Sequence, residues 1–344
     1  MIVMIATPIE PELVDRIRSV DTGNRIVWEP ALLPIPRWPS DHRGPSDFAR
    51  DAAGQARWNA MLAEADIVLG IPGESPAQLA DAVTHAPKLR WMQCMYAGAG
   101  EQIRNANLSR ADLKRIAFTT AAGVHGTTLA EFFFMGLLML RKDSRRLERL
   151  RADRFWDHWA MGELHGSSLA VIGMGAIGKA IAKIGRAFGM RIVAVTRDGR
   201  SMSEADAAYS TQKLFEAVAQ ADAAVVTLPA TEQTRHLFDR ATFAAMKKTA
   251  IFGNVGRASV ADQDALTEAL QRGELAGAVL DVFEPEPLPP EHPLWTLPNV
   301  VFSPHTAALS NRENERVVEI FCDNLKRFAT GESLRNVVHP DEFY

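Results

Sequence analysis

The sequence is short of cysteine, of net positive charge and of long apolar runs. Only Cys94 and Cys322 occur among its 344 residues, which argues against a disulfide scaffold and fits a reducing compartment such as the cytoplasm. The formal net charge of −4 gives no reason to expect a nucleic acid or an anionic membrane as partner. The most apolar helix-like run, residues 129–140, is too short to cross a bilayer and contains Glu131. What remains is ordinary globular material, enough for about two domains of roughly 150 residues each.

Strand-like and helix-like segments alternate along the chain. The first segment, MIVMIA, has no basic leader before it and is expected to be a strand. The apolar segments are rich in Val, Ile and Ala with little polar alternation, as is typical of parallel strands covered on both faces. We expect strands at 2–6, 25–28, 66–70, 90–94 and 116–120, and then at 168–173, 191–196, 223–229, 249–253, 275–281 and 299–304. This alternation predicts an α/β fold, with a C-terminal helix over 310–329 and a proline-rich surface loop over 30–45.

The strongest motif is LAVIGMGAIGKAIA, residues 169–182, in which Gly173, Gly175 and Gly178 match G-x-G-x-x-G. An apolar strand precedes the motif and an amphipathic helix follows it, which is the context that dinucleotide binding requires. Gly173 would permit the tight turn, Gly175 would let a pyrophosphate approach the backbone, and Gly178 would let helix and strand pack closely. The weaker alternative is a glycine turn in an unrelated α/β fold.

Together with later segments, this motif resembles the D-isomer-specific 2-hydroxyacid dehydrogenase family. The resemblance covers most of the chain, and the further matching segments are VVTLPATEQTRHLF (225–238), IFGNVGRASV (251–260), DVFEPEPL (281–288) and SPHTA (303–307). It implies two doubly wound domains with a cleft between them. The Rossmann NAD(P)-binding domain would span 121–311, and a flavodoxin-like, discontinuous substrate domain would span 1–120 and 312–344. The implied activity is hydride transfer between a nicotinamide cofactor and a 2-keto or D-2-hydroxy acid, of the glyoxylate/hydroxypyruvate type or a broader range.

Reduction of a 2-keto acid needs a cation for the substrate and a proton donor besides the hydride source. Arg257 follows a strand in NVGR, and a guanidinium can bind a carboxylate through two parallel hydrogen bonds while it polarises a carbonyl. His305 follows a strand in SPH, and imidazole can donate a proton in reduction and accept one in oxidation. We expect both residues to contact the substrate. The alternatives are a surface arginine and a structural histidine.

The run from 281 to 305 is dense in proline and contains several acids that compete as partner of His305. The candidates are Asp281, Glu284, Glu286 and Glu291. The residues alone leave the choice open, and a rigid loop that only closes the sheet stays an alternative. The resemblance assigns Glu286 as the partner that fixes the histidine tautomer, and Asp281 as a contact of the nicotinamide.

Other site residues follow from a turn and from the resemblance. The turn Ala97, Gly98 and Ala99 could offer N–H groups to the substrate carboxylate, although the family often has an acid where this chain has Gly100. Met95, Tyr96 and Trp295 could line the pocket, but each is more typical of a core residue. No metal site is expected. The remaining implied cofactor contacts are Thr128, Ala176, Ile177, Leu228, Pro229, Thr234 and Val255.

The choice of cofactor depends on the end of the second strand of the dinucleotide unit. In NAD enzymes an acid about 20 residues past the glycines receives the ribose 2′-hydroxyl. Alignment places Thr196 at that position, and Arg197 follows it. Threonine and arginine can both bind a 2′-phosphate, which predicts a preference for NADP, with NAD possible. If the strand ends later, Asp198 takes the role of the acid and restores a preference for NAD.

Two other functions compete with the dehydrogenase. Some relatives are redox-responsive co-repressors, but here the Arg/Glu/His set is complete and no long disordered tail is present. Relatives that act on formate carry glutamine where this chain has Glu286. The family also implies a homodimer, with residues 125–160 as the contact. The sequence does not name the 2-hydroxy acid.

Overall fold

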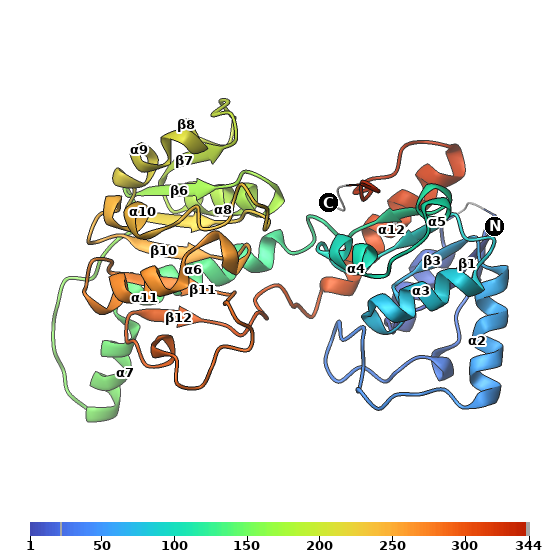
Figure 1. The fold of residues 1–344 in the computed structure, drawn as a ribbon. Helices are drawn as coiled ribbons and strands as arrows, with labels where there is room; N and C mark the ends of the chain where they lie inside the picture. The colour runs from blue at the N-terminus through green and yellow to red at the C-terminus, as the bar shows by residue number, and fades with distance from the viewer. Residues whose placement is uncertain (21–22, 342–344) are drawn as a thin grey trace. The chain divides into compact units, whose positions relative to one another are not determined.

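The structure is a computed structural model that describes residues 1–20 and 23–341. The chain divides into two compact units (Figure 1). The first unit is discontinuous and comprises residues 1–124 and 309–344, whereas the second comprises His125–Ala308. Each unit has its own parallel sheet.

The sheet of the first unit has five strands in the order β2-β1-β3-β4-β5. This order is the flavodoxin-like one, as predicted. The strands are β1 (Ile2–Ile5), β2 (Arg25–Val27), β3 (Ile67–Leu69), β4 (Trp91–Gln93) and β5 (Ala117–Thr119). The helices and 3₁₀ turns are α1 (Pro11–Arg18), η1 (Pro30–Leu32), α2 (Ala52–Glu64), η2 (Pro72–Glu74), α3 (Pro76–His85), α4 (Ala99–Asn105), α5 (Arg110–Arg115) and α12 (Glu313–Thr330).

Both faces of this sheet are buried, which explains why its strands lack polar alternation. Met4 and Val68 pack with Trp58 of α2 on one face. Val3 and Leu69 belong to the core on the other face, where α1 and α12 supply side chains such as Phe321. Each strand thus contributes alternate residues to two cores.

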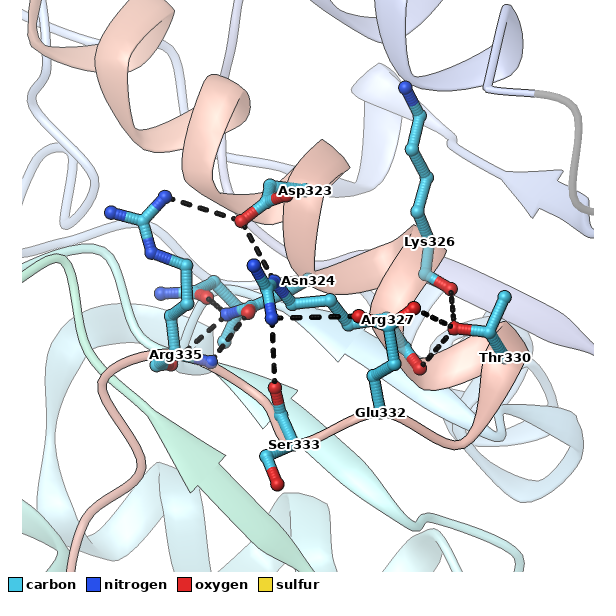
Figure 2. Close-up of polar contacts among 9 residues, drawn as sticks. Asp323, Asn324, Lys326, Arg327, Thr330, Glu332, Ser333 and Arg335 are labelled. Carbon is cyan, nitrogen blue, oxygen red and sulfur yellow. Dashed lines mark hydrogen bonds and ion pairs between the residues drawn. The ribbon is translucent and has the colours of Figure 1, made fainter.

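The segment after α12 folds back onto the edge of this sheet (Figure 2). Asp323 accepts hydrogen bonds from Arg327 Nε at 3.1 Å and Arg335 Nη1 at 3.2 Å. Asn324 Oδ1 accepts the N–H of Arg335 at 2.8 Å. Farther along, Val338 donates its N–H to the carbonyl of Phe118 at 2.8 Å. The tail therefore covers part of the otherwise open edge at β5.

The sheet of the second unit has seven strands in the order β12-β11-β10-β9-β6-β7-β8; Figure 1 shows β8 at one edge and β12 at the other. Counted from β6, the first six strands follow the Rossmann order, with one more strand at the edge. The strands are β6 (Ser168–Ile172), β7 (Arg191–Thr196), β8 (Ala207–Ser210), β9 (Ala223–Val226), β10 (Ile251–Asn254), β11 (Gly277–Leu280) and β12 (Val300–Phe302). The helices and 3₁₀ turns are α6 (Gly126–Lys142), α7 (Ser144–Asp153), α8 (Ala176–Ala187), η3 (Thr211–Lys213), α9 (Leu214–Ala219), α10 (Arg240–Ala245), η4 (Ala258–Val260), α11 (Gln263–Gln271) and η5 (Pro293–Trp295).

The apolar run at 129–140 is a helix on this sheet and forms most of α6. Phe133 and Leu137 are buried there with Val171 and Val225 of the strands. In the described part of the chain, no helix is long and apolar enough to span a membrane. By contrast, α7 has no buried residue, and Figure 1 shows it standing away from the sheet of its own unit.

Three details differ from the sequence-based expectation. Strand β8 was not predicted, and the strand expected to reach residue 229 ends at Val226. The expectation of a surface loop over 30–45 was wrong in part, because residues 32–34 and 40–42 are buried. Leu32 and Leu33 belong to the core of the first unit.

Candidate active site

The three glycines of the β6–α8 loop do different things, as the motif predicts. Gly173 has a φ of +100°, a left-handed conformation that a residue with a Cβ rarely adopts. A Cβ on Gly178 would lie 2.0 Å from the carbonyl oxygen of Gly173, whereas a Cβ on Gly175 would meet nothing within 4 Å. Gly178 therefore lets α8 pack against the strand, and the open space at Gly175 fits an approaching pyrophosphate. The exposed Ala176 and half-exposed Ile177 begin α8, where free N–H groups attract anions.

The loop after β9 is tied to this glycine turn. Thr227 Oγ1 donates to the carbonyl of Gly173 at 2.7 Å, a contact that the sequence did not single out. Leu228 lies against Gly173, with its Cδ2 2.9 Å from where a Cβ would stand. Thr234 Oγ1 donates to the carbonyl of Pro229 at 2.7 Å and accepts the N–H of Thr231 at 2.9 Å. The Thr234 hydroxyl thus holds the loop of residues 229–234, which follows the segment bonded to the glycine turn.

Strand β7 ends at Thr196, where the alignment with NAD enzymes placed the missing acid. Thr196 Oγ1 donates to Asp198 Oδ1 at 3.2 Å and accepts the N–H of Gly199 at 3.1 Å. The N–H of Arg200 also points to Asp198 Oδ1, at 3.3 Å, and lowers the pKa of that carboxyl. The carboxylate of Asp198 is therefore engaged within its own turn. Arg197 is exposed and forms no ion pair within residues 1–20 and 23–341.

Arg257 follows β10 in a turn that Asn254 holds. Asn254 Nδ2 donates to the carbonyl of Arg257 at 3.1 Å, and Asn254 Oδ1 accepts the N–H of Gly256 at 3.1 Å. The Arg257 side chain is exposed, donates to the carbonyl of Gly256 at 2.9 Å, and has no acid as partner among the described residues. Ala258, where the family often has glycine, begins η4. Val255 is buried in the core, and its N–H donates to the carbonyl of Val226 at 3.1 Å.

The structure brings Glu286 and His305 together. Glu286 Oε2 lies 2.8 Å from His305 Nδ1, and Glu286 Oε1 accepts the N–H of Phe283 at 2.9 Å. A carboxylate on Nδ1 fixes the tautomer and leaves Nε2 free to exchange a proton. The His305 and Glu286 side chains are 46% and 37% exposed, so a ligand can reach them. His305 has a φ of +54°, a strained conformation that often marks a functional residue.

Asp281 is 2% exposed and joins β11 to the segment that carries His305. Its Oδ1 accepts hydrogen bonds from the Ser303 hydroxyl and from the N–H of Ala307, the latter at 3.0 Å. Burial raises the pKa of this carboxyl. Of the other acids in the run, Glu284 is exposed and lies 3.6 Å from Arg235, and Glu291 is exposed.

The remaining predicted residues lie elsewhere within their units. In the second unit, Thr128 Oγ1 donates to the carbonyls of His125, at 3.1 Å, and Ala308, at 3.2 Å. Trp295 packs on Phe302 and is 47% exposed. In the first unit, Met95 is a core residue. The substrate turn there has an exposed Ala97, Gly98 as the residue before α4, and a buried Ala99.

Sequence reasoning missed a buried acid in the first unit. Glu74 follows β3 and is 6% exposed, and burial raises the pKa of its carboxyl to about 8. The hydroxyl of Tyr96 lies beside it, and Gln102 Nε2 donates to the Glu74 carbonyl at 2.8 Å. An acid in the segment PGES is ordinarily solvated, so no local signal indicated this burial.

Comparisons with known proteins agree with this architecture. The family model of the D-isomer specific 2-hydroxyacid dehydrogenase NAD-binding domain matches residues 134–307. A glyoxylate reductase of Aeropyrum pernix is 36% identical over 275 residues, 76% of this chain and 79% of that protein. A glyoxylate/hydroxypyruvate reductase B of Pectobacterium carotovorum is 32% identical over 81% of this chain and 87% of its own.

A solved structure extends the likeness to both units. It is a D-isomer specific 2-hydroxyacid dehydrogenase family protein of Aeromonas salmonicida, with a TM-score of 0.79, 30% identity and coverage of 99% of both chains. The chain belongs to the D-isomer specific 2-hydroxyacid dehydrogenase family and is an NAD(P)-dependent enzyme acting on 2-hydroxy or 2-keto acids.

Proposed function

We propose that this protein reduces a small 2-keto acid of the glyoxylate or hydroxypyruvate class to the D-2-hydroxy acid, with NADPH as the preferred cofactor. The observation that carries the proposal is the Glu286–His305 pair, bonded at 2.8 Å. It lies in the same unit as the unpaired Arg257 and the glycine turn. The names of the relatives from Aeropyrum pernix and Pectobacterium carotovorum support the substrate class.

Each group has a role in this reduction. Arg257 binds the substrate carboxylate through its guanidinium and polarises the carbonyl. In its protonated form, His305 donates the Nε2 proton to the carbonyl oxygen as negative charge develops there. Glu286 accepts the hydrogen bond from Nδ1–H and so keeps Nε2 as the nitrogen that exchanges the proton. When bound, the reduced nicotinamide supplies the hydride. The N–H groups of the Ala97–Ala99 turn are further donors for the substrate carboxylate.

The second unit would hold the cofactor. The space at Gly175 and the N–H groups of Ala176 and Ile177 fit a pyrophosphate. Asp281 would contact the nicotinamide. The residues that remain as cofactor contacts are Gly173, Gly178, Thr128, Leu228, Pro229, Thr234 and Val255.

The preference for NADPH follows from the turn after β7. Thr196 and the unpaired Arg197 favour a 2′-phosphate, while Asp198 is engaged by backbone N–H groups. Arg197→Ala should lower kcat/KM for NADPH by roughly 10–100-fold, the value of a charge-assisted contact. Use of NADH should change little, because that cofactor offers no phosphate to Arg197. A wild-type preference for NADH that is lost in Asp198→Ala would contradict this assignment.

The substrate class can be tested with a panel of keto acids. Glyoxylate, hydroxypyruvate, pyruvate and larger apolar 2-keto acids are each assayed with NADPH and with NADH. The proposal expects the highest kcat/KM for glyoxylate or hydroxypyruvate. Tight binding of the dinucleotide without turnover of any keto acid would instead point to a regulatory protein of the same fold.

We also propose that the protein is a homodimer whose contact includes the α7 region. This helix has no buried residue. Large apolar side chains are exposed on it and on the segments beside it, as is typical of a surface that a partner covers. They are Met135, Leu147, Phe155, Trp156 and Met161, of which Trp156 is 87% exposed. Light scattering should give twice the monomer mass for the wild type and the monomer mass for Trp156→Glu.

A further inference from the structure

Gln263 is bonded to the loop that carries Glu286 through both ends of its side-chain amide. Its Oε1 accepts the N–H of Glu284 at 2.9 Å, and its Nε2 donates to the carbonyl of Glu284 at 2.9 Å. One amide group thus satisfies both backbone polar groups of a single residue. We infer that Gln263 is a positioning residue for the Glu286–His305 pair and acts through the backbone of Glu284; this inference rests on the proposed function.

The path from Gln263 to the imidazole is short. Glu284 lies between Phe283, whose N–H donates to Glu286 Oε1 at 2.9 Å, and Pro285. Glu286 Oε2 in turn lies 2.8 Å from His305 Nδ1. A shift of the Glu284 backbone therefore moves both the N–H that orients the carboxylate and the chain that carries it.

Little else holds this stretch of chain. Residues 284–287 are exposed, whereas Phe283 and Leu288 at either end are buried. The side chain of Glu284 lies 3.6 Å from Arg235, but both side chains are about half exposed, and such surface ion pairs contribute little. The amide of Gln263 is therefore the main lateral constraint on Glu284.

Gln263 itself has a fixed position because it is the first residue of α11. Asp262 caps this helix by accepting the N–H of Ala265 at 3.0 Å, and Thr267 Oγ1 donates to the carbonyl of Gln263 at 2.7 Å. Leu266 anchors the helix in the core of the second unit. A rigid helix end is thus coupled to an exposed catalytic loop.

This arrangement predicts which kinetic constant changes when Gln263 is replaced. Without Gln263, a smaller fraction of molecules holds Glu286 on Nδ1 of His305, so proton donation slows. Gln263 has no hydrogen bond to Arg257 or to the glycine turn in the described chain, so binding of substrate and cofactor is spared. The signature is a lower kcat with KM unchanged, with kcat expressed per NADPH-binding site, because a partly unfolded variant also lowers the apparent kcat without changing KM.

The first test is Gln263→Met, which keeps the approximate volume and removes both hydrogen bonds to Glu284 together with the longer contact, 3.4 Å, between Gln263 Nε2 and His292 Nε2. With NADPH and the best keto acid, we expect kcat to fall about 10-fold, as for two neutral hydrogen bonds lost. KM and the Kd for NADPH, from its fluorescence, should stay within about 2-fold of wild type. The matched control is Gln271→Met at the other end of α11, where the glutamine is exposed; it should behave as wild type.

The second test is a double-mutant cycle with Glu286→Ala. If Gln263 acts through Glu286, Gln263→Met should have no further effect in the Glu286→Ala background, because residues that act as a unit are not additive. Gln263→Glu keeps the acceptor for the Glu284 N–H and loses the donor, so its kcat should be intermediate; it also serves if Gln263→Met folds poorly.

An unchanged kcat in Gln263→Met, or an independent loss on top of Glu286→Ala, would overturn the inference. Failure of the proposed function looks different. In that case Glu286→Ala and His305→Asn would themselves keep wild-type turnover. If those two variants lose activity while Gln263→Met does not, only the role of Gln263 is refuted.

Discussion

Both units carry polar residues after the carboxyl ends of parallel strands. These residues are half-exposed in the second unit and buried in the first. In the second unit, Glu286 and His305 are half-exposed and satisfy each other. In the first unit, the carboxyl of Glu74 is buried beside the hydroxyl of Tyr96, and burial raises the pKa of that carboxyl. One edge has polar groups that a ligand can reach, and the other has polar groups removed from water.

This difference separates catalysis from stability. Exposed and mutually bonded groups contribute little to the free energy of folding, so their replacement should mainly change turnover. A buried carboxyl opposes folding most when it is ionised, because burial disfavours its charged form. Substitutions in the second unit should therefore act on kcat, whereas Glu74 in the first unit should act on the free energy of unfolding.

The largest expected effect is that of His305→Asn. Loss of the proton donor should lower kcat by roughly 10²–10⁴-fold, the usual range for a general acid. The melting temperature and NADPH binding should stay near wild type, because the imidazole is exposed and lies outside both cores of its unit. Steady-state kinetics and thermal unfolding check both halves of this prediction. Turnover near that of wild type would remove His305 from the mechanism.

Next in size is the pH dependence caused by Glu74. The pKa of its carboxyl is about 8 in the folded protein, against an ordinary value of 4.5 for a solvated glutamate, so the unfolded chain loses this proton first as pH rises. Stability should therefore fall between about pH 4.5 and pH 8, at up to ~1.4 kcal/mol per pH unit. Glutamine does not ionise, so Glu74→Gln should be spared this loss.

Urea unfolding of wild type and Glu74→Gln at pH 5 and pH 8 measures the difference. The advantage of the variant should grow by a few kcal/mol between the two pH values. The exposed Glu12 of the same unit provides the control, since Glu12→Gln should show no such growth. A gap between wild type and Glu74→Gln that is equal at both pH values would mean that the carboxyl finds a partner.

The contrast between the units also explains how far the sequence could predict the molecule. The glycine motif of the second unit reports local backbone geometry: Gly173 has a left-handed φ and Gly178 allows a close approach, whereas the contact of Gly175 with a pyrophosphate stays a prediction. The parallel strands were predictable because burial on both faces leaves a continuous apolar run. Strand β8 was not predictable, because it has only the four residues AAYS and all of them are half-buried at the edge of the sheet.

What escaped prediction depends on contacts between distant segments. The buried Glu74 has its carboxyl beside Tyr96 and its carbonyl bonded to Gln102, and both of these residues follow a different strand. Gln263 bonds to a residue 21 positions away along the chain. Neither Glu74 nor Gln263 stands in a motif, and glutamate and glutamine are residue types that usually lie exposed. The choice of Glu286 over its acidic neighbours came from the family resemblance, since four acids of one proline-rich run were equivalent as residues.

The smallest expected effect separates packing from binding within the glycine turn itself. A Cβ on Gly178 would lie 2.0 Å from a backbone oxygen, whereas one on Gly175 would enter open space. Gly178→Ala should therefore lower the free energy of unfolding by about 1–3 kcal/mol, as overpacking does. Gly175→Ala should keep wild-type stability but weaken NADPH binding, because its methyl group occupies the space meant for the pyrophosphate. Urea unfolding and a fluorescence titration of each variant make the comparison. Equal loss of stability in both would show that the loop at Gly175 is packed rather than open, and full NADPH affinity in Gly175→Ala would place the pyrophosphate elsewhere.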